Sequence, residues 1–241
     1  MTGLLRRWML WVTAAEFVGF VTPAVVGAVT LVDEKPWAYL AMIAAGAVEG
    51  TVLGWAQMRV LRRAILGMSA RRWIVATAVG AAIAWSIGML PSTTYATWSR
   101  WPGPLAVGVG LVGALALLCS IGVAQWFELR RHLGRAGRWV AATAAAWGLG
   151  LIAFTAVATP LWQEGQSPAV VIAIGALGGL AMAATMALIT GLALRRLLAP
   201  APGHERTRRP AKPQRARRAA RARRNPAPHT APSNPRWRHA S

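Results

Sequence analysis

The sequence has a single cysteine, Cys119, and only seven acidic residues in 241. One cysteine excludes a disulfide framework and any iron–sulfur or metal site that is built from several thiolates. Charged residues make up 14% of the chain, whereas soluble domains carry about 25%. With 55% hydrophobic residues and a mean hydropathy of +0.40, the composition is that of a membrane protein.

Six apolar segments are long enough to cross a bilayer, which requires about 20 helical residues. Backbone polar groups in lipid must be hydrogen-bonded within the protein, and these segments lack the alternation of barrel strands, so we expect helices. The predicted spans are residues 8–32, 37–59, 73–90, 104–127, 139–162 and 168–194. The sequence therefore predicts an all-α integral membrane domain over residues 1–198.

The basic residues predict the orientation of these spans. If the N-terminus is cytoplasmic, 25 of the 27 Lys and Arg residues fall on the cytoplasmic side, and only Lys35 and Arg100 fall outside. Short loops rich in Lys and Arg stay in the cytoplasm, so we expect a multi-pass protein of the cell (inner) membrane with both termini inside. Tryptophans favour the headgroup level, where we expect Trp8, Trp73 and Trp139.

The starts and ends of the predicted hairpins repeat. A basic residue precedes tryptophan in Arg6-Arg7-Trp8, Arg71-Arg72-Trp73 and Gly137-Arg138-Trp139, at intervals of 65 and 66 residues. Leu-Arg-Arg ends the second helix at residues 61–63, 129–131 and 194–196. This pattern predicts three hairpin repeats in parallel orientation, related by a pseudo-threefold axis along the membrane normal. Chance matches among abundant Arg, Ala and Gly residues are the alternative.

The second helices share further residues before Leu-Arg-Arg. Gly54 and Gln57 correspond to Gly122 and Gln125, while Thr190 replaces the glutamine in the third copy. With this Gly-x-x-Gln-x-x-x-Leu-Arg-Arg exit and the Arg-x-Trp re-entry, residues 6–196 resemble a family of bacterial multi-pass membrane proteins built from repeated two-helix hairpins. The resemblance implies the architecture and no catalytic activity, and Thr190 and the long tail depart from its pattern.

Two acidic residues, Glu16 and Glu49, lie inside predicted spans. A charge at the bilayer centre costs about 2.5–3.5 kcal/mol, so such residues face the protein interior and often mark function. At 1.5 Å per residue they lie about 12 and 15 Å from the inner helix ends, so the two can meet. Neither belongs to the repeated pattern, because apolar residues occupy the corresponding positions of the other copies.

We therefore interpret Glu16, Glu49 and Gln57 as a candidate intramembrane site for protons or a cation. Burial should favour the neutral form of the acids, and two close carboxyl groups should share one proton. In the alternative interpretation, two neutral glutamic acids fix the helix packing through hydrogen bonds to Thr13 or Gln57.

Small residues predict where helices pack closely, since little hydrophobic force drives helices together in lipid. Gly46, Gly50 and Gly54 recur at four-residue spacing, and Gly122 and Gly179 lie in similar patterns of later helices. We interpret these five glycines as helix-packing residues.

The C-terminal segment 199–241 changes to Pro, Arg and Ala, which predicts a disordered basic cytoplasmic tail. Dense arginine near an anionic membrane surface should bind lipid headgroups, with an acidic protein or a nucleic acid as alternative partners. The arginines of its middle part are Arg215, Arg217, Arg218, Arg221, Arg223 and Arg224.

The sequence contains no metalloprotease, phosphate-loop or nucleophile-elbow motif, so we expect no enzyme, metal or cofactor. The first functional hypothesis is a noncatalytic structural or regulatory membrane protein, in which oligomerisation is possible. The second is a small proton-coupled carrier or permease that uses Glu16 and Glu49. A continuous polar cavity reaching both acids favours the carrier, and a dry, closely packed face at Gly46, Gly50 and Gly54 favours the scaffold.

Overall fold

The computed structural model describes residues 2–30 and 37–199, and these ranges contain helices and no strand. The helices are α1 (Thr2–Thr30), α2 (Ala38–Ala64), α3 (Ala70–Thr93), α4 (Tyr95–Trp98), α5 (Gly103–Leu129), α6 (Gly137–Leu161) and α7 (Pro168–Leu198). All except the single turn α4 are long and apolar enough to cross a membrane. The prediction of an all-α fold with six helices that are long and apolar enough to span a membrane is therefore confirmed for the described residues.

Local sequence signals define several helix ends. The side chain of Ser69 caps α3 by accepting a hydrogen bond from the backbone N–H of Arg72. Proline in the first turn opens α5 and α7, where the missing N–H removes no helical hydrogen bond. The last turns of α2 and α7 carry arginine pairs, which interact favourably with the negative end of the helix dipole.

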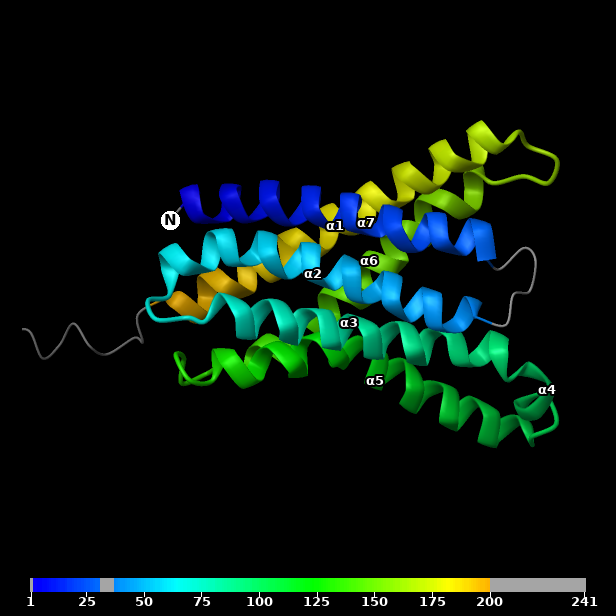
Figure 1. Ribbon diagram of the computed structural model, residues 1–241, viewed down its shortest axis with the longest axis horizontal. Coiled ribbons are helices and arrows are strands. Elements are labelled where there is room, and N and C mark those ends of the chain that lie inside the picture. Colours follow the sequence, from blue (N-terminus) through cyan, green and yellow to red (C-terminus); the bar gives the residue numbers. More distant parts are fainter. Residues whose placement is uncertain (1, 31–36, 200–241) are drawn as a thin grey trace, which may run out of the picture. The chain divides into compact units, whose positions relative to one another are not determined.

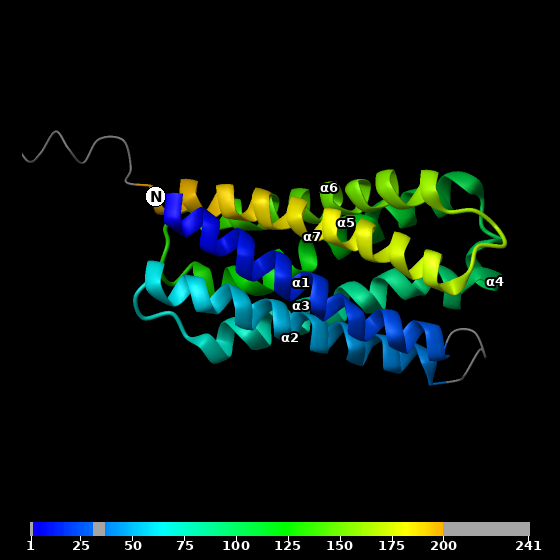
Figure 2. The ribbon, with the colours of Figure 1, turned by 90° about the horizontal axis from the view of Figure 1, so that it is seen from above.

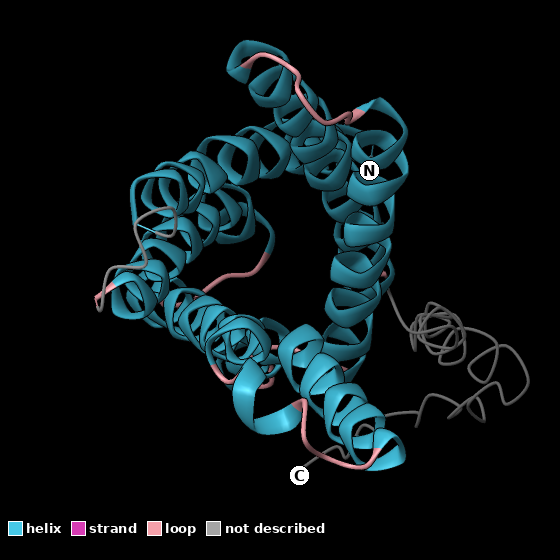
Figure 3. Ribbon diagram, turned by 90° about the vertical axis from the view of Figure 1, so that its right-hand side faces the viewer, coloured by secondary structure: helices cyan, strands magenta, loops and turns pink. Residues whose placement is uncertain are grey.

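The six long helices form a closed ring, in which each contacts its neighbours in chain order and α7 returns to α1 (Figures 1 and 3). We call one end of this bundle the Arg-rich end: it holds the start of α1, the α2–α3 and α5–α6 loops and the end of α7. The opposite, far end holds α4 and the α6–α7 loop. Arg100 is the one arginine of the described residues that lies at the far end.

Helix α1 changes its packing partner along its length, as Figure 2 shows. Near the Arg-rich end it lies against α7, where a Cβ added at Gly191 would meet the Trp8 ring at 2.8 Å. Further along it lies against α2, where a Cβ added at Gly19 would be 3.4 Å from Cγ of Glu49. This crossing brings the acidic residues of α1 and α2 to the same level.

The hydrophobic core concentrates toward the Arg-rich end. Trp8, Trp73 and Trp139 are at most 1% exposed and pack together there. Their rings therefore face the interior of the bundle instead of lipid, and the expectation that they lie at the headgroup level stays a prediction. The outer surface is apolar, with Val107 and Leu111 of α5 more than 60% exposed, as a lipid-facing surface requires.

The described bundle, up to Ala199, forms one compact unit. The predicted tail and its six arginines lie outside the described residues, so the prediction of disorder stays a prediction.

Candidate functional site

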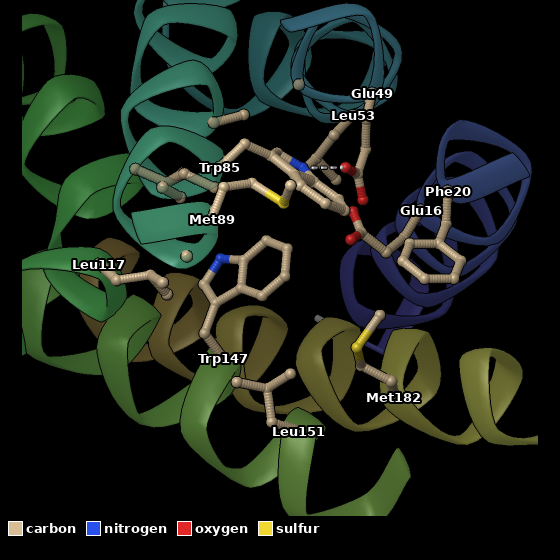
Figure 4. Close-up of a pocket in the computed structure, with 15 residues that line it drawn as sticks. Glu16, Phe20, Glu49, Leu53, Trp85, Met89, Leu117, Trp147, Leu151 and Met182 are labelled. Atoms are coloured by element: carbon tan, nitrogen blue, oxygen red, sulfur yellow. Dashed lines mark hydrogen bonds between the residues drawn. The ribbon is translucent and has the colours of Figure 1, made fainter. Parts of the chain in front are cut away.

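A cavity of about 270 Å³ lies inside the ring and receives residues from all six long helices (Figure 4). We call it the central cavity. Both sequence-predicted acids, Glu16 of α1 and Glu49 of α2, line it. The carboxyl groups point toward one another and interact electrostatically. The structure thus brings the two acids together, as their depths predict.

Glu16 is completely buried, and apart from the neighbouring carboxyl group of Glu49 its carboxyl oxygens have no hydrogen-bond partner among the described residues. Thr13, the predicted partner on the same helix, has no hydrogen-bond partner in this part of the chain either. A buried polar group without a partner is costly, by about 1–3 kcal/mol for each lost interaction. A proton shared with Glu49, or a bound cation, would satisfy the free oxygens of Glu16.

Besides the Glu16 carboxyl, Glu49 contacts the indole of Trp85, whose Nε1–H donates a hydrogen bond of 2.8 Å to the carboxyl Oε2. Trp85 lies across Gly46 of α2, and no Cβ would fit at Gly46 because it would overlap the indole ring. The glycine therefore holds the indole against α2, and from there its N–H reaches Glu49. A packing glycine and a cavity residue are parts of one arrangement.

The rest of the cavity wall is apolar and rich in aromatic and thioether side chains. Besides the acids, its large residues include Phe20, Trp85, Met89, Trp147 and Met182. Hard metal ions need six or more oxygen ligands, which this wall does not supply. Within residues 2–30 and 37–199, no group of three His, Cys, Asp or Glu side chains could hold a metal. The chemistry of the cavity fits a proton or an organic cation better than a metal ion.

Gln57, the third residue of the predicted site, does not join the two acids. Its Oε1 accepts hydrogen bonds from Nε1 of Trp73, at 3.0 Å, and from Nε2 of Gln125, at 2.8 Å. It is absent from the cavity wall. Gln57 lies two helical turns beyond Glu49 toward the Arg-rich end, and there the tryptophan cluster occupies the axis.

Three tryptophan hydrogen bonds form a layer between the cavity and the Arg-rich end. Trp139 donates to Oε1 of Gln125 at 2.8 Å, and Trp8 donates to the hydroxyl of Thr190 at 3.0 Å. Together with the Trp73–Gln57 bond, each links the first helix of one hairpin to the second helix of another. The Trp8 and Trp73 rings lie 6.0 and 6.1 Å from the ring of Trp139. Sequence reasoning missed this layer, although the glutamines inside the spans were a signal for it.

The predicted packing glycines have different environments. Added Cβ atoms at Gly50, Gly54 and Gly122 would lie 2.6–3.0 Å from atoms of the neighbouring helix, so these glycines permit close packing. At Gly179 an added Cβ would meet no atom within 4 Å, so the predicted packing role is wrong. At the neighbouring Gly178 an added Cβ would lie 3.0 Å from the ring of Phe154, so Gly178 is the glycine that permits close packing of α7 on α6.

A second acidic group, at the Arg-rich end, was not predicted. Oε1 of Glu128 accepts a hydrogen bond of 2.9 Å from the backbone N–H of Ser69 and lies 3.4 Å from Nε2 of His132. Its other oxygen lies 3.6 Å from Arg72 and 3.8 Å from Arg131. These contacts tie the α2–α3 loop to the end of α5.

No family model, curated protein or solved structure matches this chain. The resemblance to repeated-hairpin membrane proteins therefore stays a prediction. The central cavity and its acids are the features of the chain from which a function can be inferred.

Proposed function

We propose that this protein is a small carrier of the cell (inner) membrane that moves protons through Glu16 and Glu49, and that it has no catalytic activity. The observation that carries the proposal is the pair of buried carboxyl groups, Glu16 and Glu49, which face each other in the wall of the central cavity with no basic residue of the described chain beside them. A carrier requires groups that exchange a proton or a cation.

In this proposal the protein consists of three hairpin repeats around the central cavity. The tryptophan hydrogen bonds support this, because their acceptors Gln57, Gln125 and Thr190 occupy the same position of each copy. The tryptophan layer separates the cavity from the Arg-rich end. The two acids, which depart from the repeat, lie on the other side of that layer.

The proposed orientation places the Arg-rich end in the cytoplasm. All described arginines except Arg100 lie there, which agrees with the preference of basic loops for the cytoplasmic side. Both termini are then cytoplasmic, and the tail can reach anionic lipid headgroups. The central cavity lies between the tryptophan layer and the outer side of the membrane.

Dissipation of a pH gradient across liposomes tests the carrier. We expect the purified protein to dissipate the gradient faster than empty liposomes, and Glu16→Gln or Glu49→Gln to abolish the difference. Glu164→Gln is the matched control, because Glu164 lies exposed in the α6–α7 loop. Absence of flux with correctly folded wild-type protein would overturn the proposal.

The close packing of α2 on α3 favours the second candidate, a structural or regulatory scaffold. An added Cβ at Gly50 would be 2.6 Å from that of Ala81, so the helix face is tightly packed, as a scaffold predicts. If the protein is a scaffold, the Glu16→Gln and Glu49→Gln variants should fold and act as the wild type does, because neither carboxyl charge is then required. Loss of function in correctly folded variants would exclude it.

A further inference from the structure

A second cavity, of about 510 Å³, lies between α3 and α5 toward the far end of the bundle. We call it the α3–α5 groove. Its walls are apolar, with Ile87, Leu90 and Val109 along the helices and Trp98 and Trp101 at the far end. Val109 is 48% exposed, so the groove reaches the outer surface of the bundle.

The groove and the central cavity adjoin, because Gly88 of α3 and Leu117 of α5 line both. The two cavities therefore share part of one wall. At this junction the Leu117 side chain lies close to Gly88, 3.4 Å from the position that an added Cβ would take, so a larger residue at 88 would fill the space between the two cavities. A molecule in the central cavity can extend an apolar part into the groove.

The central cavity combines two acidic side chains with aromatic rings. Glu16 and Glu49 lie on one side, and the indoles of Trp85 and Trp147 line the space beside them (Figure 4). Aromatic faces attract organic cations, and carboxylates neutralise their charge. Among the described residues, Glu16 and Glu49 are the titratable groups in this wall, and no basic residue opposes a cation there.

We propose that the central cavity and the α3–α5 groove together bind an amphipathic organic cation. Its ammonium-type centre lies against Glu16, Glu49, Trp85 and Trp147, and its apolar chain lies in the groove. This inference rests on the proposed carrier function and names the substrate class of the same site. An inorganic cation would lack oxygen ligands, and an anion would meet two carboxyl groups.

Two amphiphiles of the same chain length and opposite charge test the inference. The binding of labelled decyltrimethylammonium and of labelled decanesulfonate is measured with the full chain in phosphatidylcholine nanodiscs, and partition into empty nanodiscs is subtracted. We expect saturable binding of the cation and none of the anion. Equal binding of both would overturn the proposal.

Carboxyl variants and pH locate the charged centre. Glu16→Gln and Glu49→Gln should each weaken cation binding at least tenfold, and the loop variant Glu164→Gln should leave it unchanged. Protons and the cation compete for the same carboxyl groups, so wild-type binding should weaken as the pH falls. This pH dependence is measured without any variant, so a folding defect cannot obscure the result. If cation binding changes neither with the substitutions nor with the pH, the charged centre does not lie against Glu16 and Glu49.

A pair of glycine variants tests the groove. Gly110 lines the groove, whereas Gly108 on the same helix does not, and an added Cβ at either position meets no atom within 4 Å. Gly110→Leu should weaken binding of decyltrimethylammonium several-fold and leave that of chainless tetramethylammonium unchanged. Gly108→Leu should change neither. Equal effects of the two substitutions would remove the groove from the site.

The outcomes also separate this inference from the carrier proposal. Cation binding without proton flux would support the binding site and overturn the proposal of proton transport. Proton flux without cation binding would retain the proton pathway and overturn the substrate class.

Discussion

The indole N–H of Trp8 donates a hydrogen bond of 3.0 Å to the hydroxyl of Thr190, 182 residues further along the chain. A row of helices stays open unless its last member meets its first, and this bond lies where α7 meets α1. Thr190 in turn donates to the carbonyl of Met186, one turn earlier in α7. The contact that closes the ring thus joins residues near opposite ends of the bundle's sequence.

Gln125 is expected to be the most sensitive residue of the tryptophan layer. It accepts from Trp139 and donates to Gln57 and to the hydroxyl of Thr77, so Gln125→Met removes three buried hydrogen bonds at similar volume. We expect a loss of about 1–3 kcal/mol in stability, measured by thermal unfolding in detergent. Thr155→Val, on the exposed side of α6, is the control. Equal unfolding temperatures for the two variants would contradict this role.

Substitution by alanine should destabilise the protein at one glycine of the predicted packing set and leave its stability unchanged at another. Gly50→Ala places Cβ 2.6 Å from that of Ala81 and 2.8 Å from the carbonyl oxygen of Thr77, so α2 and α3 must separate. Overpacking of this kind should cost about 1–3 kcal/mol. Gly179→Ala meets no atom within 4 Å and should leave the melting temperature nearly unchanged. A larger loss from Gly179→Ala would contradict the packing that we describe.

Glu128 should hold the α2–α3 loop in place. Glu128→Ala leaves the Ser69 N–H without its acceptor and removes the negative charge beside Arg72, at an expected cost of about 1–2 kcal/mol. Glu128→Gln keeps an acceptor for Ser69 and should have a smaller effect. Trypsin cleavage in the 62–72 region measures loop opening. We expect Glu128→Ala to be cleaved fastest, Glu128→Gln more slowly and the wild type most slowly. Identical rates would exclude the restraint.

The orientation can be tested with single cysteines in a Cys119→Ser background. Ser99 lies at the far end and Gly134 in the α5–α6 loop at the Arg-rich end, and both are exposed. In intact cells, an impermeant maleimide should label Ser99→Cys and should label Gly134→Cys only after permeabilisation. The reverse pattern would invert the proposed topology.

The basic tail should bind anionic membranes. A peptide of residues 200–241 is expected to sediment with vesicles containing anionic lipid, more weakly as salt increases, and not with neutral vesicles. Each basic residue near the surface contributes about 1 kcal/mol, so replacing six of the 12 basic residues with glutamine should weaken the binding strongly. The replaced residues are Arg215, Arg217, Arg218, Arg221, Arg223 and Arg224. Binding to RNA but not to anionic vesicles would favour the nucleic-acid alternative.

Part of the candidate site was predictable from the sequence. The depths of Glu16 and Glu49 follow from helix rise, and their burial follows from the cost of charge in lipid. Gln57 was misplaced, because depth and helix face did not reveal that Trp73 and Gln125 take its side-chain oxygen. The role of Trp85 was also hidden, since it depends on a contact with Gly46 of another helix.

The sequence by itself determined that the chain forms six apolar helices, because hydropathy and helix length are sums over neighbouring residues and need no knowledge of packing. It also predicted close approach at Gly50, Gly54 and Gly122. Only the tertiary structure decided that Trp8, Trp73 and Trp139 face inward and that Gly178, not Gly179, meets Phe154. The reason is that the rotation of each helix about its own axis is set by its contacts with neighbouring helices.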